Sequence, residues 1–384
     1  MTVSLWQRSE RLGVQDADLV VVGAGICGLS AALHAQRRGL RVRVVERHRL
    51  GAGASGRNAG FLMRGCADNY ADAVRAYGRT HAAELWRLTE RNLQGLRAEG
   101  VGSLPGTRDV PSVLLALEEG ELAKVRESLT MLREDGFDAA WIEKGRDAAW
   151  ANSGALGGLV NPGDASCHSL QVLRLLAGKL ERPVEEGQEV VEIGESGSGL
   201  RVRVTDGEFR TPRALVCTNA YAPLLLPELE GGVEPRRGQM IFVRAHGVRL
   251  DASYYANHGS EYFRQTPDGT IVVGGCRTYH ADREVGYDDR VTPWVQTDIE
   301  AFARRVLGSG FEVQGRWSGV MGFTKNHLPI IAPVCRAWDR GGRVWFCGGF
   351  TGHGMSMAYE TSRLAVGAML DGSPTGFEGG AGGI

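Results

Sequence analysis

The sequence predicts an α/β protein with two domains, one built on a parallel nucleotide-binding sheet and one on an antiparallel sheet. Three observations support this. At 384 residues the chain is long for a single core. Residues 18–46 have the pattern of a nucleotide-binding βαβ unit, and residues 239–275 alternate in the manner of antiparallel strands, with a turn at Asp268-Gly269.

The βαβ unit begins with the apolar run from Asp18 to Val22, which suits a buried parallel strand. A G-x-G-x-x-G motif follows at the start of a helix that ends at Gly39, and such a helix start binds phosphate. The strand over 41–45 then delivers Glu46, whose carboxylate suits two ribose hydroxyls and disfavours a 2′-phosphate. This Rossmann-like unit predicts NAD or FAD. Its expected binding residues are Gly23, Ala24, Gly25, Ile26, Cys27, Gly28, Glu46 and Arg47.

Composition excludes several classes of function. The chain has 44 Lys and Arg against 45 Asp and Glu, so no broad field favours nucleic acid or an acidic membrane. Its seven cysteines, an odd number without close pairs, indicate reduced thiols and no zinc or other metal site. The N-terminus lacks an apolar signal core, and no apolar run is long enough to span a membrane. We expect a cytoplasmic protein.

The remaining elements are predicted in chain order. After a Gly- and Ala-rich loop at 51–65, the pattern indicates a helix over 68–100 that buries Tyr77, His81, Leu85, Leu88 and Leu96. The later elements are a strand and helix in 110–145, a strand, turn and helix over 159–181, a hairpin from 189–193 and 200–204, a strand over 213–218, and a strand, glycine turn and helix over 343–370. The tail GGAGGI is expected to be disordered.

The C-terminal segment separates FAD from NAD. Gly348, Gly349, Gly352 and Gly354 form a second glycine-rich turn between a strand and a helix, far from the first. Only an extended ligand requires two such turns. The glycines would let backbone lie against a flat ring, and the helix N-terminus would stabilise negative charge on a reduced flavin. Taken alone, the turn has the alternative of a tight helix start with packing glycines.

Several motifs together resemble the FAD-dependent D-amino-acid oxidase superfamily, which includes glycine, sarcosine and gamma-glutamylputrescine oxidases. These are the N-terminal dinucleotide motif, 53–60, Arg-Gly-Gln at 237–239, Tyr262-Phe-Arg264 and 349–354. The resemblance covers nearly the whole chain. It implies further FAD-binding residues at Ala54, Ser55, Arg57, Asn58, Ala59, Gly60, Phe61, Val190, Thr218, Asn219, Gly349, Phe350, Thr351, Gly352, His353, Gly354 and Met355.

The resemblance also implies a domain division and a reaction. The FAD-binding domain would comprise 1–85, 152–222 and 314–384, and the substrate domain 86–151 and 223–313. Hydride would leave the carbon next to an amine for the flavin, water would hydrolyse the imine, and oxygen would be reduced to hydrogen peroxide. Such a site requires positioning and a deprotonated amine more than a strong base.

Departures from the family pattern concern the substrate. Met321 stands where enzymes acting on α-amino acids often carry a carboxylate-binding Arg and near where sarcosine oxidases carry a flavin-linking Cys, so we expect non-covalent FAD and an amine-side substrate. Ser356 stands where the family often has Lys. Arg264, on a strand that the family directs towards the flavin, is either an anion-binding residue or a structural arginine. His353 is the candidate imidazole beside the flavin, and Arg277 and Arg64 are weaker cationic candidates.

The function expected is an amine or amino-acid oxidase, similar to the gamma-glutamylputrescine oxidase branch, with Arg264, Met321 and His353 at the reaction centre. Two alternatives stay open. One is a D-amino-acid or N-methylamino-acid dehydrogenase that reduces a quinone or protein partner, and the other is an FAD-binding electron-transfer subunit. The partners would be a small amine or amino acid and oxygen or another acceptor. The sequence determines neither the amine nor the oligomeric state.

Overall fold

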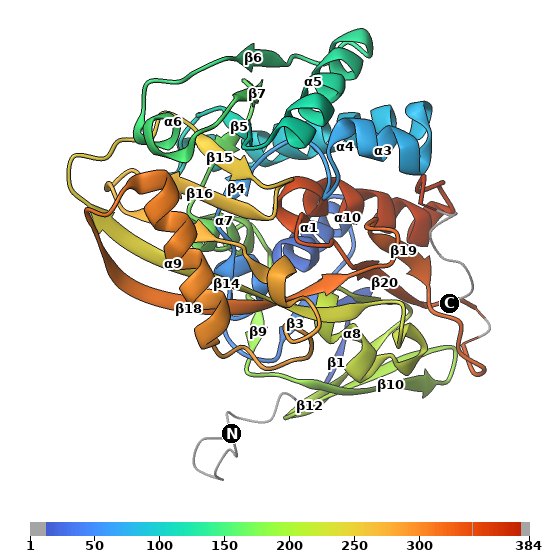
Figure 1. Cartoon of the computed structure of the whole chain (residues 1–384). Helices are drawn as coiled ribbons and strands as arrows, with labels where there is room; N and C mark the ends of the chain where they lie inside the picture. The colour runs from blue at the N-terminus through green and yellow to red at the C-terminus, as the bar shows by residue number, and fades with distance from the viewer. Residues whose placement is uncertain (1–12, 340, 378–384) are drawn as a thin grey trace.

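Two large sheets and the helices that cover them organise the chain in the computed structural model, which describes residues 13–339 and 341–377. Figure 1 shows helices α3, α4 and α5 along the top of the molecule, α9 beside β18 on the left, and β10 and β12 at the bottom. The tail 379–384, expected to be disordered, lies outside the described residues.

The six-stranded sheet is the nucleotide-binding layer. Its strands, in spatial order, are β19 (Ile330–Pro333), β20 (Val344–Gly348), β13 (Ala214–Val216), β2 (Leu19–Val22), β3 (Val42–Glu46) and β9 (Glu185–Glu186). All neighbours are parallel except β19 and β20. Because both faces are covered, β2 is apolar throughout: Leu19 and Val21 face the core around the helices, and Val20 and Val22 face a separate core.

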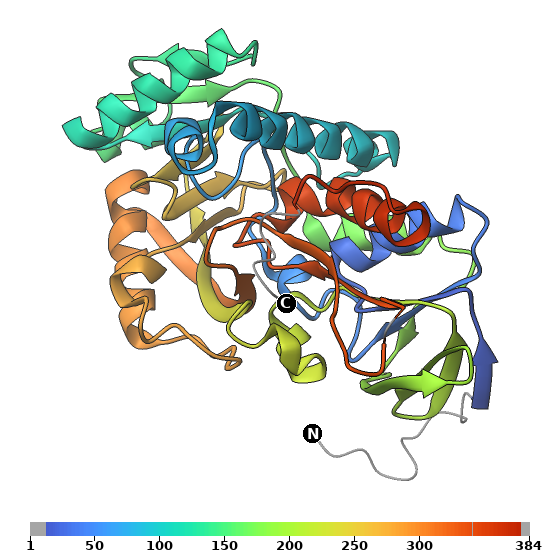
Figure 2. The ribbon, with the colours of Figure 1, turned by 90° about the vertical axis from the view of Figure 1, so that its right-hand side faces the viewer.

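Helices α1 (Ile26–Gln36) and α10 (Gly354–Asp371) lie against each other over one face of this sheet (Figure 2). Gly39 has the positive φ of 82° expected after α1. A four-stranded sheet covers the other face, in the order β1 (Gly13–Asp16), β12 (Gly207–Thr211), β11 (Gly199–Val204) and β10 (Val190–Ser196). The hairpin of β10 and β11 was predicted, whereas β1 and β12 were not.

The eight-stranded sheet forms the second domain. Its order is β18 (Phe311–Phe323), β14 (Glu234–Ala245), β17 (Ile271–Gly274), β16 (Glu261–Gln265), β15 (Ser253–Ala256), β5 (Ser112–Ala116), β7 (Gly157–Asn161) and β6 (Ala140–Ile142). Strand β7 and most of β18 lie in ranges that the sequence assigned to the FAD-binding domain. Backbone pairing of β7 with β5 and of β18 with β14 places them in this sheet instead.

The remaining helices surround these sheets. They are α2 (Ala54–Arg57), α3 (Tyr70–Tyr77), α4 (Arg79–Ala98), α5 (Glu119–Glu134), α6 (Ala148–Ser153), α7 (Ser169–Ala177), α8 (Ala222–Leu225) and α9 (Pro293–Leu307), with the short strands β4 (Phe61–Leu62) and β8 (Ala165–Ser166) and 3₁₀ turns at Val101–Ser103, Asn219–Tyr221, Pro227–Leu229 and Arg277–His280. The single helix expected over 68–100 is wrong, because Gly78 with φ 83° separates α3 from α4. His81 is exposed because it lies in the first turn of α4 and faces away from the core.

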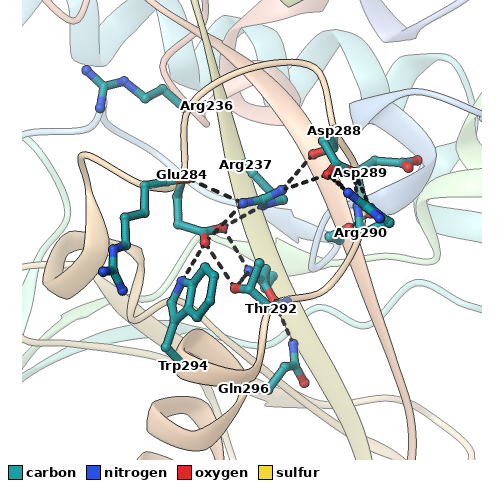
Figure 3. A network of polar contacts seen from close by, with 12 residues as sticks. Arg236, Arg237, Glu284, Asp288, Asp289, Arg290, Thr292, Trp294 and Gln296 are labelled. Atoms are coloured by element: carbon teal, nitrogen blue, oxygen red, sulfur yellow. Dashed lines mark hydrogen bonds and ion pairs between the residues drawn. The ribbon is translucent and has the colours of Figure 1, made fainter.

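A buried ionic network joins β14 to the loop that precedes α9. Glu284 is fully buried and accepts hydrogen bonds from Arg237 Nε (2.6 Å), Gln239 Nε2 (2.8 Å), Thr292 Oγ1 (3.0 Å) and Trp294 Nε1 (3.0 Å). Figure 3 shows Arg237, Thr292 and Trp294 around this carboxylate. Burial alone would raise the pKa of this carboxyl, but these bonds lower it below its ordinary value. The Arg-Gly-Gln motif therefore uses its two polar side chains to anchor the loop.

Replacing Glu284 with Ala removes the buried acid 2.6 Å from Arg237 Nε and leaves this guanidinium with the half-exposed Asp288, 3.8 Å from Nη1. We expect the free energy of unfolding to fall by about 3–5 kcal/mol, because breaking a buried pair from one side leaves an uncompensated charge. Urea denaturation followed by circular dichroism measures it. The control is Glu143→Ala, which removes an exposed partner of Arg126 and should cost less than about 1 kcal/mol. Equal losses of unfolding free energy in the two variants would contradict the conclusion that the buried Glu284 network stabilises the fold.

Candidate active site

One cavity of about 730 Å³ lies between the two large sheets and collects most of the predicted site residues. It is lined by the ends of β2, β3 and β13, by the loop 51–61, by β14, β16 and β18, and by the start of α10. A volume of this size is typical of cofactor and substrate sites. Of the predicted residues, Gly28, Gly349 and Arg264 do not line the cavity.

At one end of the cavity, the turn after β2 leads into α1. Gly23 has φ 99°, and a Cβ on Gly28 would lie 1.9 Å from the Gly23 carbonyl oxygen, so Gly28 allows close packing of helix and strand. The first turn of α1 carries no acidic residue and no side-chain cap. Its positive dipole end therefore faces the cavity and would stabilise a phosphate.

Glu46 and Thr218 present polar atoms next to this turn. The Glu46 carboxylate accepts hydrogen bonds from the N–H groups of Ala24 (3.0 Å) and His48 (2.9 Å), which fix it at the cavity edge. Thr218 Oγ1 is buried without a partner among the described residues. Val190, an expected FAD-binding residue, also lines the cavity. A dinucleotide would satisfy the buried Thr218 hydroxyl.

The loop 51–61 forms the middle of the cavity wall and is braced by its own polar side chains. Ser55 Oγ accepts from the Ile26 N–H (3.0 Å), so this helix amide is not free for phosphate. Asn58 Oδ1 accepts from the Gly60 N–H (2.7 Å) and from Ser169 Oγ (2.6 Å). Arg57 donates to the Ser318 carbonyl (2.9 Å). Ser55, Arg57 and Asn58 thus position the loop as well as lining the cavity.

Arg264 lies behind this loop, not in the cavity. Its Nε donates to the Ala59 carbonyl and its Nη2 to the Cys167 carbonyl (2.8 Å). The side chain is 5% exposed, and burial lowers its pKa. Of the two roles expected for Arg264, these contacts favour the structural one: backbone carbonyl groups accept from Nε and Nη2, while Nη1 is buried without a partner among the described residues. A Cβ on Gly60 would lie 2.4 Å from Arg264 Nη2, which accounts for that glycine.

The second glycine turn lies at the other end of the cavity. Gly349 and Gly352 have φ values of 75° and 83°, and Thr351 between them has φ 46°, which is rare for a β-branched residue. The Thr351 N–H donates to the Gly322 carbonyl (2.9 Å), which holds this conformation. The N-terminus of α10 has no side-chain cap and no acidic residue in its first turn. Two helix N-termini therefore open into one cavity.

Two imidazoles line the cavity near this turn. His353 Nδ1 lies 3.2 Å from the Thr351 carbonyl, and burial lowers the pKa of His353, which favours the neutral ring. His327 was not predicted. Its Nδ1 lies 3.1 Å from Asp68, whose carboxylate raises the pKa of His327. His327 also has φ 59°, an unusual value for a residue other than glycine that no sequence pattern revealed.

The rest of this end is largely apolar and aromatic. Met321 lines the cavity as predicted, and its Sδ would lie 3.8 Å from a Cβ on Gly352. Tyr255 and Tyr262 also line the cavity, and their hydroxyls form no hydrogen bond within residues 13–339 and 341–377. Burial raises the pKa of Tyr262 to about 12, so it stays a donor. Side chains alternate between the two faces of a strand, so Tyr262 and Arg264 lie on the same face of β16, and this spacing could have identified Tyr262 from the sequence.

The two weaker cationic candidates lie in different places. Arg64 is buried and forms ion pairs with Glu90 (3.1 Å) and Asp164 (3.6 Å), outside the cavity. Arg277, by contrast, lines the cavity. Within the described ranges, no cluster of three or more His, Cys, Asp or Glu side chains is placed to hold a metal, and no helix is long and apolar enough to cross a membrane.

The fold and the site define a dinucleotide-binding flavoenzyme, since the glycine cradle, the orphaned Thr218 hydroxyl and two helix N-termini along one cavity fit FAD. Residues 18–367 match the family model DAO, described as FAD dependent oxidoreductase. The match spans most of the chain. The protein therefore belongs to this family and is an FAD-dependent oxidoreductase.

Known relatives agree with this membership. The chain is 25% identical to gamma-glutamylputrescine oxidoreductase of Escherichia coli (94% of this chain, 85% of the relative) and 26% identical to glycine oxidase of Pseudomonas aeruginosa (93% and 95%). The crystal structure of glycine oxidase from Geobacillus kaustophilus superposes with a TM-score of 0.75 at 20% identity, covering 94% of this chain and 96% of that one. This likeness confirms the predicted two-domain α/β fold.

Precipitating the holoenzyme with acid or heat should release intact FAD. The cysteines that line the cavity within the described residues are Cys27 and Cys217, which lie beside the first glycine turn, whereas Met321 lies against the second. The measurement is the absorbance and mass of the flavin in the supernatant. Flavin that stays on the washed protein pellet, or a fluorescent protein band after denaturing electrophoresis, would show that the cofactor is covalently attached.

Proposed function

We propose that this protein oxidises an amine, removing hydride from the carbon next to nitrogen and passing the electrons to oxygen. The imine formed would be hydrolysed by water to a carbonyl compound and an amine or ammonia, and oxygen would take up the two electrons and two protons as hydrogen peroxide. The relatives that carry gamma-glutamylputrescine oxidoreductase and glycine oxidase activities support this class. FAD, when bound, supplies the hydride acceptor.

The proposal rests on the cavity wall at the second glycine turn, where no carboxylate of the described residues lines the cavity. Among described residues that line the cavity, the carboxylates are Glu46, Glu189 and Asp289. Glu46 and Glu189 lie at the nucleotide end, and Asp289 is 3.3 Å from Arg57 Nη1. Loss of hydride from a neutral amine requires positioning and no strong base, which suits this wall.

His353 and the tyrosines would orient the substrate. When His353 Nδ1 carries its proton and donates to the Thr351 carbonyl, Nε2 is left as an acceptor for an amine N–H. The hydroxyls of Tyr255 and Tyr262 supply further hydrogen-bonding groups in the cavity. Met321 gives this part of the cavity apolar surface, which would exclude water from the reacting carbon.

Anaerobic mixing with the correct amine should bleach the flavin absorbance. The panel comprises simple amines, polyamines, D-amino acids and N-methyl amino acids. At least one class should reduce the cofactor, and admitting air should restore the yellow colour and produce one equivalent of hydrogen peroxide. Bleaching by none of them would count against the proposal. Bleaching that reverses with a quinone dye but not with air would favour the dehydrogenase alternative.

The value of kcat/KM should rise with pH by about tenfold per unit between about pH 7 and pH 9, because only the deprotonated amine reacts. The lowered pKa of His353 keeps its ring neutral over this range, so His353 adds no second ionisation to the pH profile of kcat/KM. The raised pKa of His327 makes that residue the competing explanation. His327→Gln should therefore retain the slope. A flat profile in the wild type, or loss of the slope in His327→Gln, would contradict the assignment.

A further inference from the structure

Arg277 presents a guanidinium group to the cavity without an acidic partner. It is half-buried, and in the described part of the chain it forms no ion pair and no hydrogen bond. The other arginines that line the cavity differ in this respect: Arg47 lies 3.5 Å from Glu189, and Arg57 lies 3.3 Å from Asp289. A partly desolvated cation without a counter-charge is costly, so an anion bound beside it would be stabilised.

The groups around Arg277 do not supply that anion. The ionisable neighbours that influence it are Arg236, Tyr262, Glu284 and His327. Glu284 is the acid among them, and its carboxylate is already occupied by Arg237 and Gln239. His327 is paired with Asp68. The cavity wall at this point therefore carries excess positive charge.

The backbone before Arg277 is held in an unusual conformation. Gly275 has φ 113°, and a Cβ there would lie 2.1 Å from the Ser260 carbonyl oxygen. Cys276 has φ 57°, which is uncommon for a residue other than glycine, and its side chain is buried. Strain of this kind persists where the surrounding structure enforces it, and it is concentrated at ligand-binding sites. Here it ends β17 and begins the short helix at Arg277–His280.

The guanidinium stacks on Phe323, with its central carbon 4.6 Å from the ring centroid. Stacking covers one face of the guanidinium and leaves its N–H edges available for a bidentate contact. Phe323 follows Met321 on the same face of β18, so their side chains are about 6.6 Å apart along the strand. Of these two side chains, Met321 lies next to Gly352 at the second glycine turn. Arg277 therefore lies beside Phe323, two residues along β18 from Met321.

We propose that Arg277 binds a carboxylate of the substrate, and that the substrate is an amine whose carboxylate is separated from the oxidised carbon by a spacer of several bonds. This inference rests on the proposed amine oxidation for its substrate class. We infer the spacer because Arg277 lies beside Phe323 and not beside Met321. We infer the carboxylate because the N–H groups of the Arg277 guanidinium have no acidic partner among the described residues. An amine with an α-carboxylate would leave Arg277 without its partner.

The kinetic test compares 5-aminopentanoate with its amide and with glycine. The wild type should prefer the spaced carboxylate. Arg277→Met should lower its kcat/KM about 10- to 100-fold and leave the amide within about threefold, because one charge-assisted pair is lost. Arg277→Lys should recover part of the loss. The matched control is Arg283→Met, which removes the same charge from an arginine stacked on Trp294 outside the cavity.

A binding test is independent of turnover. Pentanoate and pentanamide lack the amine, so they are titrated into the holoenzyme and followed by the change in flavin absorbance. The wild type should bind pentanoate more tightly than pentanamide. This difference in affinity should disappear in Arg277→Met and persist in Arg283→Met. Equal affinity of the two ligands, an equal loss in Arg283→Met, or an Arg277-dependent preference for glycine would overturn the inference. If no amine reduces the flavin while pentanoate still depends on Arg277, the proposed function fails and the carboxylate site stands.

Discussion

The close approach of α1 to β2 is the constraint on which the site depends. A Cβ on Gly28 would lie 1.9 Å from the Gly23 carbonyl oxygen, so only glycine allows the helix to begin this near to the strand. That position brings the uncapped N-terminus of α1 to the cavity and places the Ile26 N–H within 3.0 Å of Ser55 Oγ. The loop that separates the two ends of the cavity is thereby attached to the nucleotide-binding turn.

The two domains share this loop. Arg264 reaches from the eight-stranded sheet to the Ala59 carbonyl, and Arg57 reaches from the loop to the Ser318 carbonyl on β18. Both arginines therefore hold the loop in place, and Arg57 lines the cavity as well. The consequence of these contacts is that the cavity wall is held from both sides. The shape of the cavity therefore depends on how the sheets are placed relative to each other, and not on the loop alone.

Prediction succeeded where the signal was local. The βαβ unit, the hairpin of β10 and β11 and the final strand, turn and helix follow from periodicity and glycine positions within short segments. It failed where pairing is between distant segments. Strand β1 pairs with β12 across nearly 200 residues, and β7 and β18 join a sheet whose other strands lie elsewhere in the chain. No periodicity within a strand identifies its neighbour.

The sequence by itself determined the cofactor class, because backbone turns that approach a dinucleotide require glycine at fixed spacing, and that requirement is visible in one dimension. The tertiary structure decided which cation faces the cavity. Arg264 and Arg277 are both arginines near the ends of neighbouring strands, β16 and β17, and the family resemblance favoured Arg264. Carbonyl groups from distant segments cover Arg264, whereas the turn at Gly275 and Cys276 directs Arg277 onto Phe323. Burial and partners depend on segments that only folding brings together.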